Sequence, residues 1–171
     1  MNRAQFHVHN DRYFGSPTFG APMDWIEIAL RLVAATLIGS IFGLNRDLHG
    51  KPTGIRTLGL VGLGSALVVV ACMDFPASAG ANFTAASRAI QGVLTGIGFL
   101  GAGVIVRGMG GSRVHGLTTA ACTWLVACLG IVCGFAGWRV IVIAVVLALL
   151  VLTLGGRIER LFHGETRPPE K

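Results

Sequence analysis

The chain has 171 residues, of which 53% are hydrophobic and only 13% charged, and its mean hydropathy is +0.69. A soluble domain carries about a quarter of its residues as charges, so this chain has too little polar surface to cover its own apolar content. The same composition excludes disorder, a collagen-like structure and a disulfide scaffold. The net charge of +6 contains no basic run, which argues against nucleic-acid binding. The composition predicts a protein surrounded by membrane lipid.

The first 22 residues differ from the rest, because they show neither helical nor strand periodicity. We expect a disordered N-terminal tail over 1–23, with Met23 as an alternative start site. His7 and His9 have no third ligand beside them, so they do not define a metal site. No metal and no cofactor are expected. The four cysteines lie in or beside apolar runs and are interpreted as small hydrophobic residues of packed helices.

Five apolar stretches follow the tail. A hydrocarbon core of about 30 Å needs roughly 20 helical residues, so these stretches predict an all-α polytopic membrane protein. The helices are expected near 25–44, 56–73, 87–106, 117–134 and 138–156. They form one five-helix domain over 24–156, and a short cytoplasmic tail follows over 157–171.

The loops divide into two sets with unequal positive charge. Nine of the 14 Lys and Arg residues belong to the 45–55 and 107–116 loops, the start of the second helix and the C-terminal tail, against five for the other set. Cytoplasmic loops carry the excess of Lys and Arg. We therefore expect a membrane protein with its N-terminus outside and its C-terminus in the cytoplasm.

Small residues at intervals of four mark helix contact faces in membranes. Ala35, Gly39 and Gly43 form such a face on the first helix, which continues through Arg31 and Glu27, a pair that can share charge. The fourth helix repeats the pattern with Gly130 and Gly134. The third helix has five glycines on two faces and is therefore either approached closely from two sides or interrupted. Those five are Gly92, Gly96, Gly98, Gly101 and Gly103.

Charged and hydroxyl residues at helix ends are the functional candidates, because ionisable groups are rare at such places in membranes. The candidates are Asn45, Arg46, Asp47, Arg56, Thr57, Arg88, Thr118 and Thr119. We expect Asp47 to pair with Arg56 across the short 45–55 loop, together with carbonyls freed near Gly116. Arg88 is expected to pair with Glu27, Asp74 or carbonyls freed by a broken third helix. No hydrolase or metalloprotease motif and no carboxylate pair within one apolar segment is present, so no catalytic residue and no enzyme is predicted.

Four ordered motifs resemble the MgtC/SapB family of bacterial inner-membrane proteins. They are Gly-Leu-Asn-Arg-Asp at 43–47, Lys-Pro-Thr-Gly-Ile-Arg-Thr at 51–57, Thr-Gly-Ile-Gly-Phe-Leu-Gly-Ala-Gly-Val-Ile at 95–105, and Val-His-Gly-Leu-Thr-Thr-Ala-Ala-Cys-Thr-Trp at 114–124. The resemblance spans about residues 24–156. Its signature positions are Arg46, Gly54, Arg56, Thr57, Arg88, Gly96, Gly98, Phe99, Gly101, Gly103, Gly116, Leu117 and Thr119. The sequence Asn-Arg-Asp at 45–47 resembles that of the SapB-like branch of the family. The resemblance does not include the C-terminal cytosolic domain of longer members.

The resemblance implies a role in growth at low Mg²⁺, in magnesium homeostasis and, in pathogens, in virulence. It also implies restraint of the ATP synthase or control of membrane potential as the mode of action. From the residues, two functions stay open. One is a regulator that acts by lateral contact with membrane proteins through small-residue faces. The other is a transporter or channel for a small ion or solute. A homodimer or small homo-oligomer is expected, because five helices cannot all hide their glycine faces internally.

Overall fold

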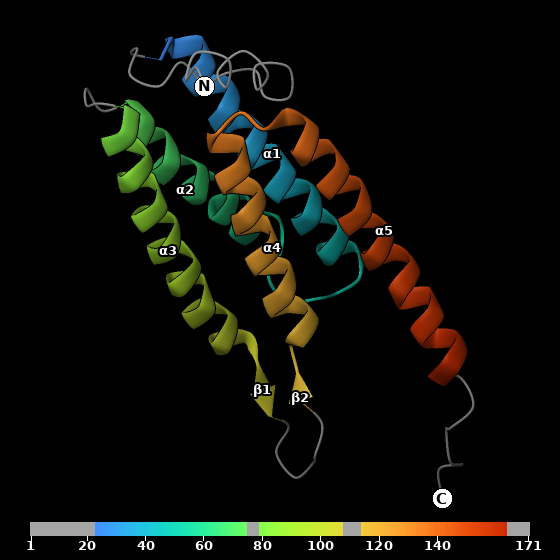
Figure 1. The fold of residues 1–171 in the computed structure, drawn as a ribbon. Coiled ribbons are helices and arrows are strands. Elements are labelled where there is room, and N and C mark those ends of the chain that lie inside the picture. Colours follow the sequence, from blue (N-terminus) through green and yellow to red (C-terminus); the bar gives the residue numbers. More distant parts are fainter. Residues whose placement is uncertain (1–22, 75–78, 108–113, 164–171) are drawn as a thin grey trace, which may run out of the picture.

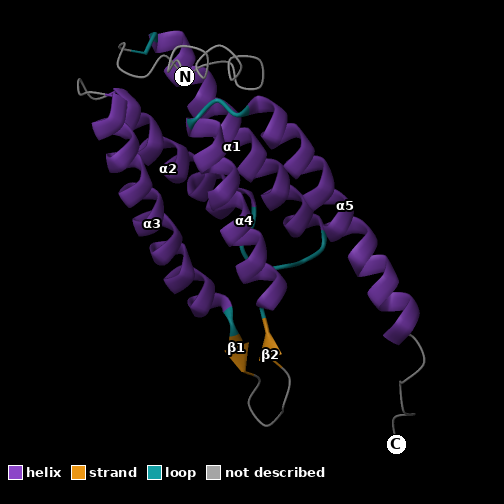
Figure 2. Cartoon of the chain, viewed as in Figure 1, coloured by secondary structure: helices purple, strands orange, loops and turns teal. Residues whose placement is uncertain are grey.

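The computed structural model describes residues 23–74, 79–107 and 114–163, and it consists almost entirely of helices (Figure 1). In chain order these are α1 (Trp25–Leu48), α2 (Ile55–Asp74), α3 (Ala79–Val104), α4 (Leu117–Gly134) and α5 (Trp138–His163). Between α3 and α4 two short strands, β1 (Val106–Arg107) and β2 (Val114–His115), form an antiparallel ladder (Figure 2). The prediction of an all-α membrane protein is confirmed.

Four of the described helices are long and apolar enough to cross a membrane, namely α1, α2, α4 and the Trp138–Gly155 part of α5. The helix absent from this set is α3, which was also predicted to span. It nevertheless runs along the bundle at one edge, whereas α5 forms the opposite edge (Figure 1), and it packs on α2 and α4. Its lower hydropathy comes from polar residues such as Asn82, Arg88 and Gln91.

Helix boundaries depart from the sequence prediction where polar residues continue a helix. α1 extends to Leu48 instead of ending at 44, and α5 extends to His163 instead of 156. α3 begins at Ala79 instead of 87, and within it the hydroxyls of Thr84 and Ser87 bond back to the carbonyls of Gly80 and Thr84, at 2.9 Å each. α3 is also continuous to Val104, so the alternative of an interrupted third helix is wrong. The predicted disordered tail lies outside the described residues, except for Met23.

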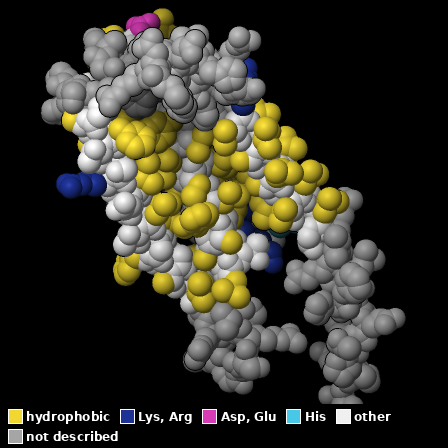
Figure 3. Space-filling view, viewed as in Figure 1, with side chains coloured by type: hydrophobic (Ala, Val, Ile, Leu, Met, Phe, Trp, Pro, Cys, Tyr) yellow, Lys and Arg dark blue, Asp and Glu magenta, His cyan; other side chains and the backbone are white. Residues whose placement is uncertain are grey.

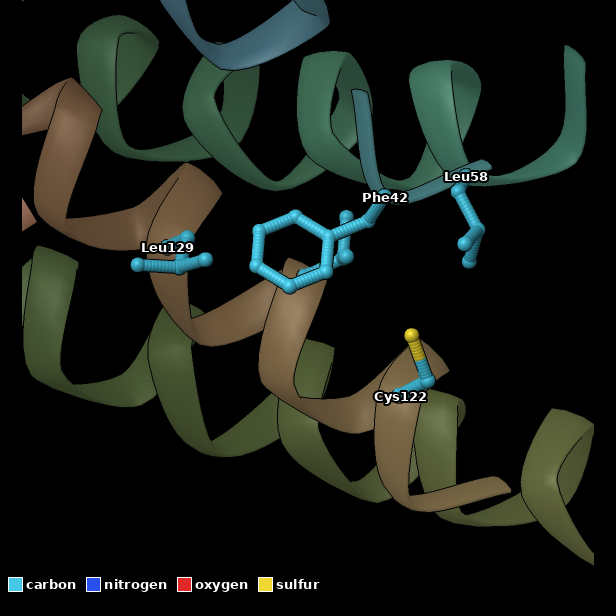
Figure 4. Close-up of a cluster of buried hydrophobic side chains, with 5 residues drawn as sticks. Phe42, Leu58, Cys122 and Leu129 are labelled. Carbon is cyan, nitrogen blue, oxygen red and sulfur yellow. The ribbon is translucent and has the colours of Figure 1, made fainter. Parts of the chain in front are cut away.

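Three helices, α1, α2 and α4, form the centre of the bundle and approach each other through glycine. A methyl group on Gly39 of α1 would collide with the backbone at Leu58 of α2, and one on Gly130 of α4 would collide with the carbonyl of Gly62. The predicted contact faces on α1 and α4 are therefore used for packing. Beside them lies a core cluster that includes Phe42, Leu58, Cys122 and Leu129 (Figure 4).

Much of the outer surface of the bundle is apolar. Large side chains such as Leu37 and Ile41 on α1 and Val146 and Val151 on α5 are exposed, and hydrophobic atoms cover much of the face drawn in Figure 3. Such a surface suits lipid rather than water. The four cysteines are free, and Cys122 and Cys133 are buried, which agrees with their interpretation as small hydrophobic residues.

Candidate functional site: the arginine clamps at the two ends of the bundle

The bundle has two ends that differ in their connections. We call the end with residues 49–54 and the β1–β2 ladder the loop end, and the end with the 135–137 connection between α4 and α5 the turn end (Figure 1). Most of the sequence-predicted site residues belong to the loop end. The structure joins two of them, Arg46 and Thr119, by a hydrogen bond and leaves the others apart.

Arg46 is the centre of the loop end. It stands in the last turn of α1, and only 4% of its side chain is exposed. Its Nε and Nη2 atoms donate to the carbonyl oxygen of Pro52 at 3.1 and 3.0 Å, and Nη2 also donates to the hydroxyl of Thr119 in the first turn of α4. One side chain thus joins α1, the 49–54 loop and α4. We call this arrangement the Arg46 clamp.

The loop is shaped to present the Pro52 carbonyl to Arg46. The Lys51 N–H donates to the carbonyl of Arg46 at 3.1 Å, which turns the chain back after α1. Gly50 and Thr53 both have positive φ angles, of 61° and 63°. Glycine adopts this conformation readily, but threonine does so rarely. The Thr53 hydroxyl donates to Pro52 O at 2.6 Å, so the strained residue is tied to the same carbonyl as Arg46.

Within the described residues, the Asp47 carboxylate bonds to the start of α2 rather than to a cation. Its Oδ2 accepts the N–H of Ile55, the first residue of α2, at 3.0 Å. Any side chain on Gly54 would collide with the Asp47 carboxylate. A carboxylate on a free N–H at a helix start satisfies an orphan donor and complements the positive end of the helix dipole. The carboxylate of α1 therefore caps α2.

The predicted Asp47–Arg56 pair is wrong. Arg56 and Thr57 are exposed in the first turn of α2, and Arg56 has no hydrogen bond or ion pair within the described residues. Thr118 is exposed, while its neighbour Thr119 is buried. Asn45 is half-buried, and its carbonyl lies 2.6 Å from His49 Nδ1. In the first turns of α2 and α4, Arg56, Thr57 and Thr118 thus face away from the clamp, and Thr119 alone of the predicted residues there bonds to Arg46.

Arg88 also lies elsewhere than predicted. Because α3 begins at Ala79, Arg88 is nine residues inside the helix and not at its start. It is exposed and contacts neither Glu27 nor Asp74 within hydrogen-bonding distance. The third helix is unbroken, so it offers no free carbonyl at this level.

A second clamp at the turn end was missed as a site by sequence reasoning. Arg31 of α1 is 3% exposed, and its Nη1 donates to the carbonyl of Gly134, the last residue of α4, at 2.6 Å. Nη2 pairs with Glu27, as the i,i+4 spacing predicted, whereas the buried Nε has no partner in the described part of the chain. The only sequence signal for the Gly134 contact is an arginine on a small-residue stripe.

The connection from α3 to α4 depends on Gly116, which precedes α4 with a φ of 91°. A side chain there would also collide with the carbonyl of Val104 at the end of α3. Gly116 therefore fixes where α4 starts relative to α3. Since Thr119 is in the first turn of α4, this placement delivers its hydroxyl to Arg46.

The chemistry of the Arg46 and Arg31 sites is limited to that of arginines, hydroxyls and carbonyls. Among the described residues, no group of three His, Cys, Asp or Glu could hold a metal ion. Arginine is a permanent cation that only donates hydrogen bonds, so both clamps hold helix ends in place. The fold and the site together define a helical membrane domain. Two buried arginines of its first helix form hydrogen bonds with the two ends of α4.

Comparison with known proteins places this domain in a family. The MgtC family profile matches residues 32–161, and the chain belongs to the MgtC family. It is 42% identical to protein SrpB of Synechococcus elongatus over 145 residues, which are 81% of this chain and 80% of that protein. It is 39% identical to protein MgtC of Salmonella typhimurium over 111 residues, 64% of this chain but only 44% of that protein.

A third relative is named for transport. The chain is 36% identical to the putative magnesium transporter YhiD of Escherichia coli over 130 residues, 74% of this chain and 59% of that protein. The chain therefore spans less than two thirds of the Salmonella and Escherichia proteins. No solved structure matches it.

Proposed function

We propose that this protein is a non-enzymatic regulator in the bacterial inner membrane that supports growth at low Mg²⁺ by lateral contact with other membrane proteins. The N-terminus lies outside and the C-terminus in the cytoplasm, which makes the loop end cytoplasmic. Control of membrane energetics, through the ATP synthase or the membrane potential, is the proposed consequence, and virulence is proposed only as a secondary outcome in a pathogenic host.

The close packing of α1, α2 and α4 carries this proposal. A methyl group on Gly62 would lie 2.5 Å from the carbonyl oxygen of Ala35, and one on Gly134 would lie 2.6 Å from the Val69 side chain. Helices in such contact leave no space for an ion path between them. Because much of the exterior is apolar and α1, α2 and α4 are in close contact, contact with other proteins along the membrane is the mode of action that the fold favours.

The association with magnesium rests on relatives. The name of YhiD describes a putative magnesium transporter, which favours transport of a small ion as the second candidate function. Mg²⁺ is bound in proteins by carboxylate and other oxygen ligands. The buried charged side chains among the described residues are instead Arg31 and Arg46, which repel a cation. We therefore rank regulation above transport.

Two measurements separate these functions. A strain that lacks its own family member and grows poorly at low Mg²⁺ is complemented with the wild-type chain or with Arg46→Ala, at matched protein abundance. We expect growth to be restored by the wild type alone. In parallel, the purified protein in liposomes is tested for Mg²⁺, proton and anion flux. Flux above empty liposomes that Arg46→Ala abolishes would overturn regulation in favour of transport.

A further inference from the structure

One face of α3 is polar and open. Exposed residues recur at intervals of three and four along it, and we call this set the open face: Thr84, Arg88, Gln91, Gly92, Thr95 and Gly96. A 26-residue helix is about 39 Å long and the hydrocarbon core about 30 Å thick. With α3 centred in the membrane, Arg88 lies about 9 Å inside the core and Gln91 lies near its middle.

Contact with lipid chains is unfavourable for this face. Arg88 has no hydrogen bond or ion pair within the described residues, and Thr95 bonds only to its own helix, at the carbonyl of Gln91. Charged and polar side chains at such depth almost always face other protein or a water-filled cavity. This agrees with the finding that α3 is not among the helices apolar enough to cross a membrane by itself.

The glycines of the open face differ from those of the bundle centre. A methyl group on Gly39, Gly62 or Gly130 would collide with the backbone of a neighbouring helix. A methyl group on Gly92 or Gly96 would meet no atom within 4 Å. The chain thus uses glycine for close backbone approach among α1, α2 and α4, and on α3 Gly92 and Gly96 offer the same means of approach but are unoccupied within one copy.

We propose that the open face of α3 binds the open face of α3 in a second copy of this chain. All copies insert in the membrane in one orientation, so two α3 helices run parallel. A glycine pair spaced by four, here Gly92 and Gly96, is the pattern at which parallel membrane helices cross closely. Gln91 and Thr95 flank this crossing and can bond across it. A twofold axis makes the interface self-complementary and closed.

The charges at the turn end are compatible with this pairing. Arg88 lies one turn from the glycine crossing, where right-handed helix pairs, crossing at about 40°, have begun to separate. α2 packs against α3 and ends at Asp74, an exposed carboxylate that accepts the Met23 N–H at 3.1 Å and has no paired cation in the described chain. In the twofold pair, the two Arg88 side chains and the Asp74 carboxylates of both copies therefore lie toward the same end of the bundle.

The inference holds whether the protein regulates or transports, and its test does not use growth. In a background without the native cysteines, Gln91→Cys is oxidised in native membranes beside Leu37→Cys, a matched control on the exposed face of α1. We expect a crosslinked dimer with Gln91→Cys and not with Leu37→Cys. Equal crosslinking of both, or none at Gln91, would overturn the proposal. Crosslinking of Gln91→Cys to a different protein only would reject the second copy as the occupant.

A bulky residue on the open face provides the second measurement. Gly96→Leu should leave the monomer folded, because the site is open in one copy, but should raise the dissociation constant of the dimer in lipid at least about tenfold. Gly64→Leu on α2 is the control, since Gly64 is also exposed with no atom near its missing side chain. Dimerisation is measured by energy transfer between labelled copies in liposomes, and folding by helical circular dichroism. A wild type that stays monomeric, or a folded Gly96→Leu that dimerises like Gly64→Leu, contradicts the proposal.

Discussion

Arg31 and Arg46 lie fifteen residues apart on the buried face of α1, and each donates a hydrogen bond to an opposite end of α4. Fifteen helical residues rise about 22 Å, which matches most of the length of α4. The two contacts differ electrically. Arg31 binds the last carbonyl of α4, where the helix dipole attracts a cation. Arg46 meets the positive end of α4, so it binds a side-chain hydroxyl there and relies on the Pro52 carbonyl for its remaining bonds.

The hydroxyl of Thr119 is the part of the Arg46 clamp that can be removed with least change of shape. Thr119→Val should lower the free energy of unfolding by about 1.5–3 kcal/mol, the range for a lost hydrogen bond to a charged group. Thr118→Val is the control, because Thr118 is exposed beside it, and it should stay within about 0.5 kcal/mol of the wild type. Unfolding in mixed detergent micelles measures both. Equal stability of the two variants would mean that Thr119 does not hold Arg46.

Asp47 should act through α2. Asp47→Ala removes the side chain that accepts the Ile55 N–H and should destabilise the protein by about 0.5–2 kcal/mol. It should also impair growth at low Mg²⁺, because the loop that presents Pro52 to Arg46 loses its attachment to α2. Lys51→Ala, in the same loop but with an exposed side chain, should leave stability and growth unchanged. A loss of growth with Lys51→Ala as large as with Asp47→Ala would instead assign the loop a role through its positive charge.

The helices and their contact faces could be predicted from the sequence, whereas the contacts between the ends of different helices could not. Apolar length and small-residue spacing suffice for the helices and for the faces of α1 and α4, since both are local patterns. Arg46 and Thr119 were each selected as candidates, but they are 73 residues apart, and nothing local shows that they meet. The Asp47–Arg56 prediction failed because it matched opposite charges and overlooked the free N–H of Ile55.

The predicted start of α3 was wrong for a related reason. Asn82, Thr84 and Ser87 are typical of loops, yet in α3 the hydroxyls bond to their own helix and Asn82 donates to the carbonyl of Met73 at 3.4 Å. Contact with the end of α2 thus supports helix where local propensity does not. Moving the start to Ala79 carries Arg88 from the end of the predicted helix to nine residues inside the observed one, which is why the sequence alone placed this arginine near the wrong partners.

Glycine packing predicts a contrast within α2. Gly62→Ala should destabilise the protein by about 1–3 kcal/mol, the range for overpacking, because its methyl group would lie 2.5 Å from the carbonyl of Ala35. Gly64→Ala, two residues later on the exposed side, should be neutral or stabilise by up to about 1 kcal/mol through helix propensity. Thermal unfolding in one detergent compares them. If Gly64→Ala were the more damaging change, α2 would have to be turned relative to α1.

The last prediction concerns the orientation of the bundle in the membrane. The same measurement tests whether α3 crosses the membrane. Lys51 in the loop end and Asp74 at the turn end are exposed, and α2 separates them. In a background without the native cysteines, Asp74→Cys should react with a membrane-impermeant maleimide in intact cells, and Lys51→Cys only after the inner membrane is opened. A third cysteine at Ile105, just after α3 and exposed, should behave like Lys51→Cys if α3 crosses the membrane. Reaction of the Lys51 and Ile105 positions in intact cells, with Asp74 protected, would show that the bundle is inverted. Reaction at Ile105 together with Asp74 would show that α3 does not cross, which would leave four spans and put both ends of the domain on one side.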